Sequence, residues 1–169
     1  ADMLLFADRE SVELRFIEYM DVGGATKWST QRVLSSSEIL TELAKQTGLI
    51  ETVAGRGSAP SQRYRLPNGQ VFGVIASVTE PFCGSCDRAR VTADGTLFTC
   101  LYGELGTDLR RILRGKDGIT GVQKAFQMAW QHRRDQGAVE RSHVADRAAW
   151  VSIERLRKEP RLEMHTRGG

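Results

Sequence analysis

The sequence predicts an α/β fold in which helices and strands alternate along the chain. An amphipathic segment at 1–8 runs directly into a strand-like segment at 11–20, a capped helix follows at 35–47, and two more strand-like segments lie at 62–66 and 70–78. A helix that leads straight into a strand is typical of an αβ repeat, and this repeat starts within its helix. We therefore expect the chain to be the C-terminal part of a longer protein.

The first strand and the first complete helix have clear boundaries. The segment 11–20 is rich in aromatic and β-branched residues, and a glycine-containing loop follows it at 21–26. Ser35 and Glu38 have the spacing of a capping box, which predicts the start of a helix that Gly48 ends. The apolar residues that share one face of this helix are Ile39, Leu40, Leu43 and Ala44.

Strands and turns are predicted for the middle of the chain. The composition of 51–62 predicts a loop, and a turn at 67–69 joins the second and third strands. A further turn at 93–96 predicts a hairpin between 88–92 and 97–101.

Helices are predicted again after this hairpin. The apolar spacing predicts helices over 105–114 and 120–132. The residues expected to face inward in the second of them are Val122, Phe126, Ala129 and Trp130. The remaining residues, 133–169, are strongly polar and are expected to form a helical tail.

The composition excludes several classes of protein. The 169 residues are 40% hydrophobic and 27% charged, which are ordinary values for a globular protein. A net charge of +3 is too small to indicate nucleic acid or a membrane surface as a partner. No apolar run could span a membrane, and an odd, clustered cysteine count does not form a secreted disulfide framework. We therefore expect a cytoplasmic location.

The cysteines carry the strongest functional signal. Cys83 and Cys86 form a CxxC pair, and Cys100 follows after thirteen residues. Thiolates suit zinc, copper(I) and iron–sulfur clusters, but structural zinc needs a fourth ligand and the three histidines are distant in the sequence. A redox CxxC pair would leave Cys100 unexplained. Three thiolates that hold a 4Fe–4S cluster with one iron open fit the pattern best.

Two arginines lie between the second and third cysteines. Arg88 and Arg90 are two residues apart, so on a strand both point to the same face and can converge on one anion. The alternative is a solvent-facing strand with surface ion pairs, to Asp87 or Asp94. The nearness of the three thiolates favours a phosphate or carboxylate ligand.

The expected hairpin has a register problem. If its turn contained two residues, Arg90 would lie opposite Thr99, and Cys100 would face the other way. We therefore expect a bulge or a longer turn, which would bring Cys100 and the arginines to one side.

Three motifs resemble one enzyme family. The segment 81–101 resembles the C-terminal cluster motif of the GTP 3',8-cyclases of molybdenum cofactor biosynthesis, which are radical S-adenosylmethionine enzymes. The segment 15–20, followed by a glycine-rich loop, resembles the strand that closes their S-adenosylmethionine site. The final two glycines resemble their double-glycine tail.

The resemblance implies a fold and a reaction. Residues 1–50 would be the last βα part of an incomplete TIM-type (β/α) radical S-adenosylmethionine barrel, and 51–169 an α+β cluster-binding extension with a polar helical tail. In the full enzyme, an N-terminal 4Fe–4S cluster cleaves S-adenosylmethionine to a radical that acts on GTP, which becomes 3',8-cyclo-7,8-dihydroguanosine 5'-triphosphate. A second, C-terminal 4Fe–4S cluster binds the guanine.

The resemblance also implies roles for individual residues. The ligands of the C-terminal cluster would be Cys83, Cys86 and Cys100. The contacts to GTP would come from Arg88, Ala89 and Arg90. The contacts to S-adenosylmethionine would come from Arg15 and Met20. The tail that enters the active site would be Arg167, Gly168 and Gly169.

Arg15 has two interpretations. An arginine within an apolar strand is costly to bury unless it is paired. A ligand carboxylate at the end of the strand would account for it, and so would a local pair with Glu13 or Glu18.

The pattern departs from the family in one respect, because the CxxxCxxC motif of the first cluster is absent. The chain alone is therefore expected to be inactive and to need an N-terminal radical half. The other implied partners are GTP, a second copy in a homodimer, and the downstream cyclic pyranopterin monophosphate synthase. Two alternatives stay open, a zinc-stabilised binding module without catalysis and an electron-transferring cluster extension of another radical enzyme.

Overall fold

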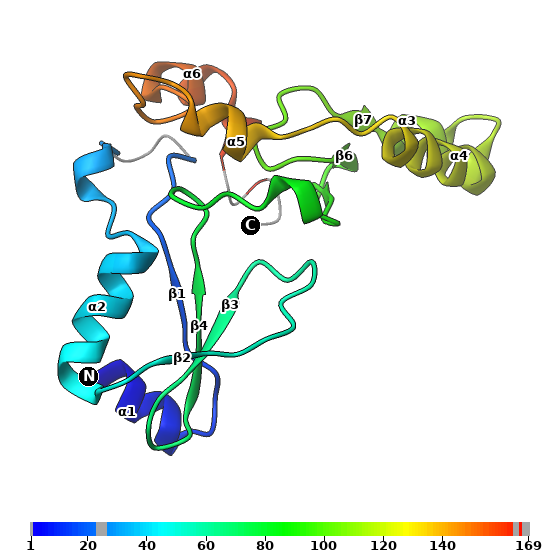
Figure 1. The fold of residues 1–169 in the computed structure, drawn as a ribbon. Helices are drawn as coiled ribbons and strands as arrows, with labels where there is room; N and C mark the ends of the chain where they lie inside the picture. Colours follow the sequence, from blue (N-terminus) through cyan, green and yellow to red (C-terminus); the bar gives the residue numbers. More distant parts are fainter. Residues whose placement is uncertain (1, 23–26, 164–165, 167–169) are drawn as a thin grey trace. The chain divides into compact units, whose positions relative to one another are not determined.

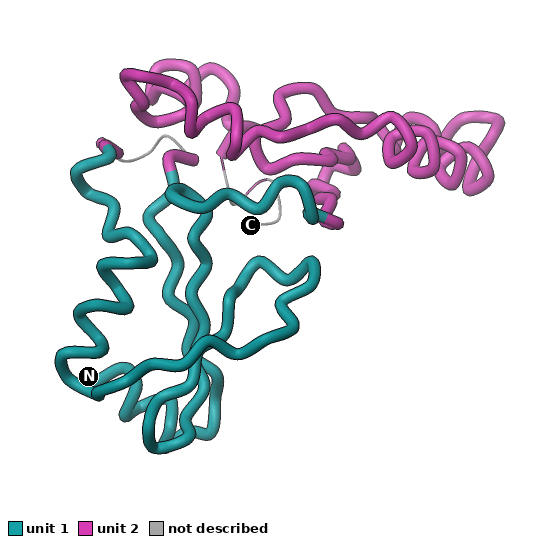
Figure 2. Tube along the Cα trace, in the orientation of Figure 1, with its two compact units in different colours: residues 1–20, 30–86 teal, residues 21–29, 87–169 magenta. Residues whose placement is uncertain are grey.

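The computed structural model describes residues 2–22, 27–163 and 166 (Figure 1). The chain divides into two compact units, residues 1–20 with 30–86 and residues 21–29 with 87–169, and each is described by itself (Figure 2). Each unit contains one β-sheet and several helices, so the predicted mixture of α and β structure is confirmed. Among the described helices, none has the length and apolar character that crossing a membrane requires.

Unit 1 is a four-stranded sheet with the order β1-β4-β3-β2. Its strands are β1 (Arg15–Ile17), β2 (Glu51–Thr52), β3 (Gln62–Arg65) and β4 (Val71–Ile75). Its helices are α1 (Asp2–Arg9) and α2 (Ser36–Thr47), with short 3-10 turns η1 (Thr30–Arg32) and η2 (Cys83–Ser85). β1 runs parallel to β4, and the other pairs are antiparallel. Because β1 and β4 are parallel, their carboxyl ends lie at the same edge of the sheet.

The core of unit 1 joins both helices to the sheet. Its buried side chains are Leu4, Ile39, Leu43, Leu66, Phe72 and Val74. Phe72 is fully buried and stacks on Tyr64 with 5.6 Å between the ring centroids. The predicted capping box is present, because the Ser35 hydroxyl accepts from the Glu38 amide and the Glu38 carboxylate accepts from the Ser35 amide. Gly48 ends the helix as expected.

Unit 2 contains a three-stranded sheet and four α-helices among its described residues. The strands are β5 (Arg90–Val91), β6 (Thr96–Phe98) and β7 (Thr107–Asp108). The helices are α3 (Leu109–Arg114), α4 (Gly118–Gln131), α5 (Gly137–Ser142) and α6 (Ile153–Lys158), followed by η3 (Pro160–Leu162). The polar region after 132 has its own buried cluster of Val151, Leu156 and Leu162. It is therefore packed structure and not only a polar tail.

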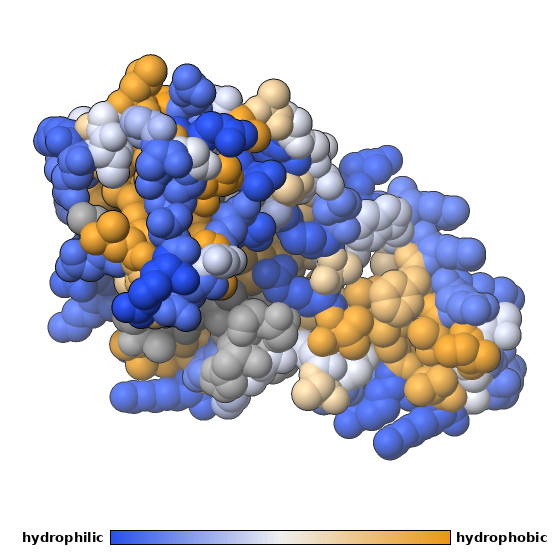
Figure 3. Space-filling model, turned by 90° about the horizontal axis from the view of Figure 1, so that it is seen from below, coloured by the Kyte–Doolittle hydropathy of each residue, from blue (hydrophilic) through white to orange (hydrophobic). Residues whose placement is uncertain are grey.

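Two expectations about unit 2 and one about unit 1 are wrong. The helix predicted from 105 starts at Leu109, because the Asp108 side chain accepts from the Arg111 amide and caps it there. Two of the four residues expected to face inward in α4 are exposed, Phe126 at 40% and Trp130 at 46%, whereas Val122 and Ala129 are half-buried. Figure 3 shows apolar surface over this part of the molecule. The loop expected at 51–62 contains the short strand β2, which is exposed and lacks an apolar alternation.

Candidate functional site

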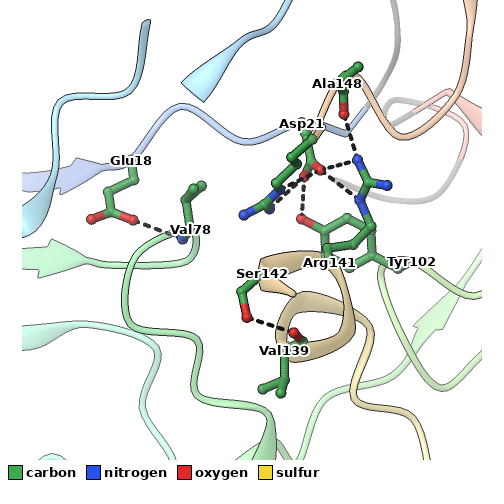
Figure 4. A network of polar contacts seen from close by, with 9 residues as sticks. Glu18, Asp21, Val78, Tyr102, Val139, Arg141, Ser142 and Ala148 are labelled. Carbon is green, nitrogen blue, oxygen red and sulfur yellow. Dashed lines mark hydrogen bonds and ion pairs between the residues drawn. The ribbon is translucent and has the colours of Figure 1, made fainter. Parts of the chain in front are cut away.

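A buried carboxylate lies at the end of β1. Glu18 is 1% exposed, and its carboxylate accepts hydrogen bonds from the backbone amides of Ser36, Val78 and Thr79, each at 2.8 Å, and from the Thr79 hydroxyl. Figure 4 shows the bond from Val78. Ser36 is the first residue of α2. The Glu18 carboxylate therefore accepts from backbone amides both at the start of this helix and in the segment after β4. Glu18 therefore fixes the end of the strand that precedes Met20.

A second buried carboxylate follows directly after Met20. Asp21 is 0% exposed and accepts from the Tyr102 hydroxyl at 2.7 Å, from Arg141 Nε at 2.8 Å and from Arg147 Nε at 2.9 Å (Figure 4). Its own carbonyl accepts from the Trp150 amide. One aspartate thus ties the start of a loop to two segments that lie far away along the chain.

The charges around Asp21 favour its ionised form. Burial alone would raise the pKa of the carboxyl, but hydrogen bonds from Arg147, Tyr102 and Arg141 outweigh burial and hold the pKa below its ordinary value. Burial and the nearby carboxylate raise the pKa of the Tyr102 phenol, which stays a donor. We call Asp21, Tyr102, Arg141 and Arg147 the Asp21 cluster. It is an ion-pair network in which the Tyr102 hydroxyl donates to the Asp21 carboxylate.

Arg15 differs from the expectation of a buried cation. Its side chain is 53% exposed, and its Nε lies 3.0 Å from the Glu13 carboxylate, which also pairs with Arg63 at 2.9 Å. The interpretation as a local pair with Glu13 is therefore the one that the structure shows. The reason is that Arg15 lies on the exposed face of β1, where burial alternates and only the middle residue, Phe16, is half-buried. A ligand role for Arg15 stays a prediction, as does one for Met20.

The hairpin that carries the arginines has the longer turn that its register requires. Arg90 pairs with Phe98, not with Thr99, and the Thr92 amide donates to the Thr96 carbonyl at 2.9 Å. Three residues therefore form the loop, and Gly95 has a φ of 86°. The same register, extended by two residues, would set Arg88 opposite Cys100.

Burial alternates along this segment. Arg88 and Arg90 are half-buried, whereas Asp87, Ala89 and Val91 are exposed. Nη1 of Arg88 and Nε of Arg90 are buried atoms. Arg90 begins β5 and Arg88 precedes it, and the alternating burial agrees with two arginine side chains that point the same way. Their predicted contact with GTP stays a prediction.

Replacing Gly95 by alanine should destabilise this hairpin. Alanine would have to adopt a left-handed φ, and its methyl would lie 3.0 Å from Arg110 Cβ. We expect the free energy of unfolding to fall by about 1–2 kcal/mol in urea denaturation. The matched control is Gly84→Ala, where nothing lies within 4 Å of the new methyl. Equal denaturation midpoints for the two variants would contradict the turn geometry.

The cysteines fall in different units. Cys83 is the first residue of the η2 turn of unit 1 and Cys86 follows its last residue, and the Cys86 amide donates to the Cys83 carbonyl at 3.1 Å. Cys100 follows β6 in unit 2. All three are thiols, and each is partly exposed. Among the described residues, no group of three or more His, Cys, Asp or Glu side chains forms a metal site. The donor chemistry of three thiols fits an iron–sulfur cluster, and their convergence stays a prediction.

Cys100 also lines a cavity within unit 2. The cavity has a volume of about 740 Å³, and its wall includes Tyr102, Arg133, Glu140 and Arg141. Cavities of this size accommodate small molecules. Because guanidinium and carboxylate groups both line it, the wall is polar without favouring one sign of charge.

The remaining sequence-derived site residues are Arg167, Gly168 and Gly169, and they lie outside the described residues. The sequence pattern did not indicate a structural role for Glu18 or any role for Asp21. An acidic residue directly after an apolar strand was the available signal, but the sequence does not identify its distant partners.

Comparison with known proteins identifies the family. The family model described as Molybdenum Cofactor Synthesis C matches residues 12–139. The chain belongs to this family. It is similar to the curated GTP 3',8-cyclase 3 of Mycobacterium bovis, with 46% identity over all 169 residues and 45% of the relative's length. It is also similar to GTP 3',8-cyclase 1 of Mycobacterium tuberculosis, at 44% identity over the whole chain and 47% of that protein. The GTP 3',8-cyclase of Synechococcus sp. (strain WH7803) is 42% identical over 136 residues.

The chain spans about half the length of the mycobacterial relatives it matches. The Molybdenum Cofactor Synthesis C region contains the three cysteines, Asp21 and Tyr102, whereas Arg141 and Arg147 lie beyond its last matched residue. The Asp21 cluster therefore joins the family region to the segment that follows it.

Proposed function

We propose that this chain is the GTP-binding, cluster-holding part of a GTP 3',8-cyclase in molybdenum cofactor biosynthesis. The observation that carries the proposal is similarity along the whole chain, cysteine hairpin included, to proteins that bear this name. In support, the longer turn sets Arg90 opposite Phe98, the register in which Cys100 and the arginines can share a side.

The residues of the chain have distinct parts in this proposal. Cys83, Cys86 and Cys100 would hold a 4Fe–4S cluster, which supplies an open iron that binds the guanine of GTP. Arg88 and Arg90 would neutralise the phosphates with planar, bidentate hydrogen bonds, and Ala89 between them would lie at the same ligand.

The remaining parts of the reaction would lie largely outside these residues. Three cysteines can hold one such cluster, so a CxxxCxxC cluster that cleaves S-adenosylmethionine would belong to an N-terminal radical half. Arg15 and Met20 would contact S-adenosylmethionine. The parallel β1–β4 pair supports a place in a (β/α) barrel, and the connection between its strands contains α2 followed by β2 and β3.

This proposal also carries the remaining expectations from the family. They are a glycine tail that enters the active site, a homodimer, a cytoplasmic location and a downstream cyclic pyranopterin monophosphate synthase. We expect the isolated chain to lack cyclase activity.

Anaerobic reconstitution tests the cluster. We expect the chain to take up about four iron and four sulfide, as a 4Fe–4S cluster requires. Cys86→Ala should lose most of this uptake because a cluster ligand is gone. Stoichiometric zinc without sulfide in the purified chain would instead support the zinc-stabilised module and overturn the proposal.

GTP titration of the reconstituted chain tests the arginines. We expect Arg90→Ala to weaken GTP binding by about 10- to 100-fold, since a charge-assisted hydrogen bond contributes about 1.5–3 kcal/mol. Arg114→Ala is the matched control, because Arg114 is an exposed arginine at the end of α3. Equal GTP affinities for the two variants would count against the assigned role.

A further inference from the structure

Cys100 is closely packed on one side by the first residue of α5. A Cβ atom built on Gly137 would lie 3.1 Å from Cys100 Sγ and 2.6 Å from Tyr102 Cβ. The chain turns tightly after the thiol, because the Gly103 amide donates to the Cys100 carbonyl at 3.1 Å. The sulfur therefore lies against a backbone position that has no room for a methyl group.

The Asp21 cluster holds both partners of the contact between Cys100 and Gly137, because it includes Tyr102 near the cysteine and Arg141 on the helix of the glycine. Tyr102 is 8% exposed, donates its hydroxyl to Asp21 at 2.7 Å, and packs edge-on against Trp150 with 5.6 Å between the ring centroids. Arg141 lies on α5, four residues after Gly137, and donates to the same aspartate at 2.8 Å. Figure 4 shows Asp21 between Tyr102 and Arg141. Asp21 therefore holds the tyrosine two residues after the thiol and the helix whose first residue packs against the thiol.

We propose that Asp21 and Gly137 are positioning residues for Cys100. Gly137 lets α5 approach the thiol because it has no side chain. Asp21 keeps α5 and the thiol segment together, since it accepts from Arg141 on α5 and from Tyr102 beside the thiol. A cluster ligand needs such support, because the sulfur must be held in place before the metal binds. The proposal rests on the proposed function in one respect, which is that Cys100 ligates a cluster.

Asp21 has a further consequence through its place in the sequence. It directly follows Met20, which is expected to contact S-adenosylmethionine. The buried carboxylate of the residue after Met20 therefore accepts from Tyr102, which lies two residues after the third thiol.

The first test measures the thiol without metal. The apo-chain is alkylated briefly, and the rate at each cysteine is measured by peptide mass spectrometry. We expect Gly137→Ala, Tyr102→Phe and Asp21→Asn to change the rate at Cys100 several-fold, with Cys83 and Cys86 as internal references that do not change. The matched controls are Ser142→Ala, an exposed residue of α5, and Glu104→Gln, which removes the surface pair with Arg155.

The second test measures cluster retention. Loss of outer contacts to a metal ligand costs about 10-fold or more in affinity, so the three variants should lose the reconstituted cluster to a chelator about 10-fold faster than the controls. An unchanged rate at Cys100, or an equal change at all three cysteines, would overturn the proposal. The proposal would also be overturned if the three variants changed the alkylation rate at Cys100 alone but retained the cluster as well as the controls do.

The two tests separate this proposal from the proposed function. A wild-type chain that takes up no iron and sulfide refutes the cluster, whatever the labelling shows. In that case, the alkylation rates alone decide whether Asp21 and Gly137 place Cys100.

Discussion

Replacing Asp21 by alanine is expected to lower the free energy of unfolding by about 3–5 kcal/mol, as removal of one partner from a buried ion pair does. The variant leaves Arg147, whose side chain is 5% exposed, and Arg141 beside a cavity where the carboxylate was. It also leaves the buried Tyr102 hydroxyl without its acceptor. Urea denaturation of the wild type and the variant measures the difference.

Asparagine at position 21 separates charge from shape. It keeps an acceptor for Tyr102 but cannot form the ion pairs, so Asp21→Asn should lose less stability than Asp21→Ala. Tyr102→Phe removes one hydrogen bond to the charged carboxylate and should cost about 1.5–3 kcal/mol. A loss for Asp21→Ala no larger than that for Tyr102→Phe would show that the two guanidiniums find other partners.

Acid should remove the contribution of Asp21. Its folded-state pKa lies below the ordinary value of 3.8, so the ionised carboxylate stabilises the folded chain. This stabilisation is complete above about pH 5, declines as the pH falls past the ordinary value of 3.8, and is lost below the folded-state pKa. Asp21→Asn should therefore show a smaller loss of stability between pH 5 and pH 3. Parallel pH profiles for the two proteins would contradict the lowered pKa.

Local signals in the sequence predicted local structure. The capping box of Ser35 and Glu38 lies within four residues, and both of its hydrogen bonds are present. We predicted a longer hairpin turn because Cys100 and the arginines could share a side only with such a turn. The pairing of Arg90 with Phe98 confirms the longer turn. Such features depend on neighbours that the sequence displays side by side.

The features that the sequence did not predict depend on distant partners. The groups that hold Asp21 are 81, 120 and 126 residues away along the chain, on segments whose own patterns give no reason to meet. The prediction that Phe126 and Trp130 of α4 face inward was wrong for a related reason. Helical periodicity shows that Phe126 and Trp130 share a face, but it does not show whether another element covers that face.

Replacing Glu18 by alanine is expected to cost more than about 3 kcal/mol, because each unsatisfied buried donor costs about 1–3 kcal/mol. The lost carboxylate accepts from three backbone amides and one hydroxyl, and these donors belong to the start of α2 and to the segment after β4. The damage should therefore be local to the end of β1. Amide hydrogen exchange should show lost protection at Ser36, Val78 and Thr79, while the Phe72 amide inside the sheet stays protected.

Two variants make this prediction specific. Glu18→Gln keeps one acceptor oxygen but turns an amide group toward at least one donor, so its loss should lie between that of alanine and the wild type. Glu10→Ala removes an exposed carboxylate whose pair with Arg9 is 2.8 Å long, and surface pairs contribute about 0–1 kcal/mol. Unchanged exchange at Ser36 and Val78 in Glu18→Ala would mean that water replaces the carboxylate. In that case Glu18 could not be what fixes the backbone before Met20.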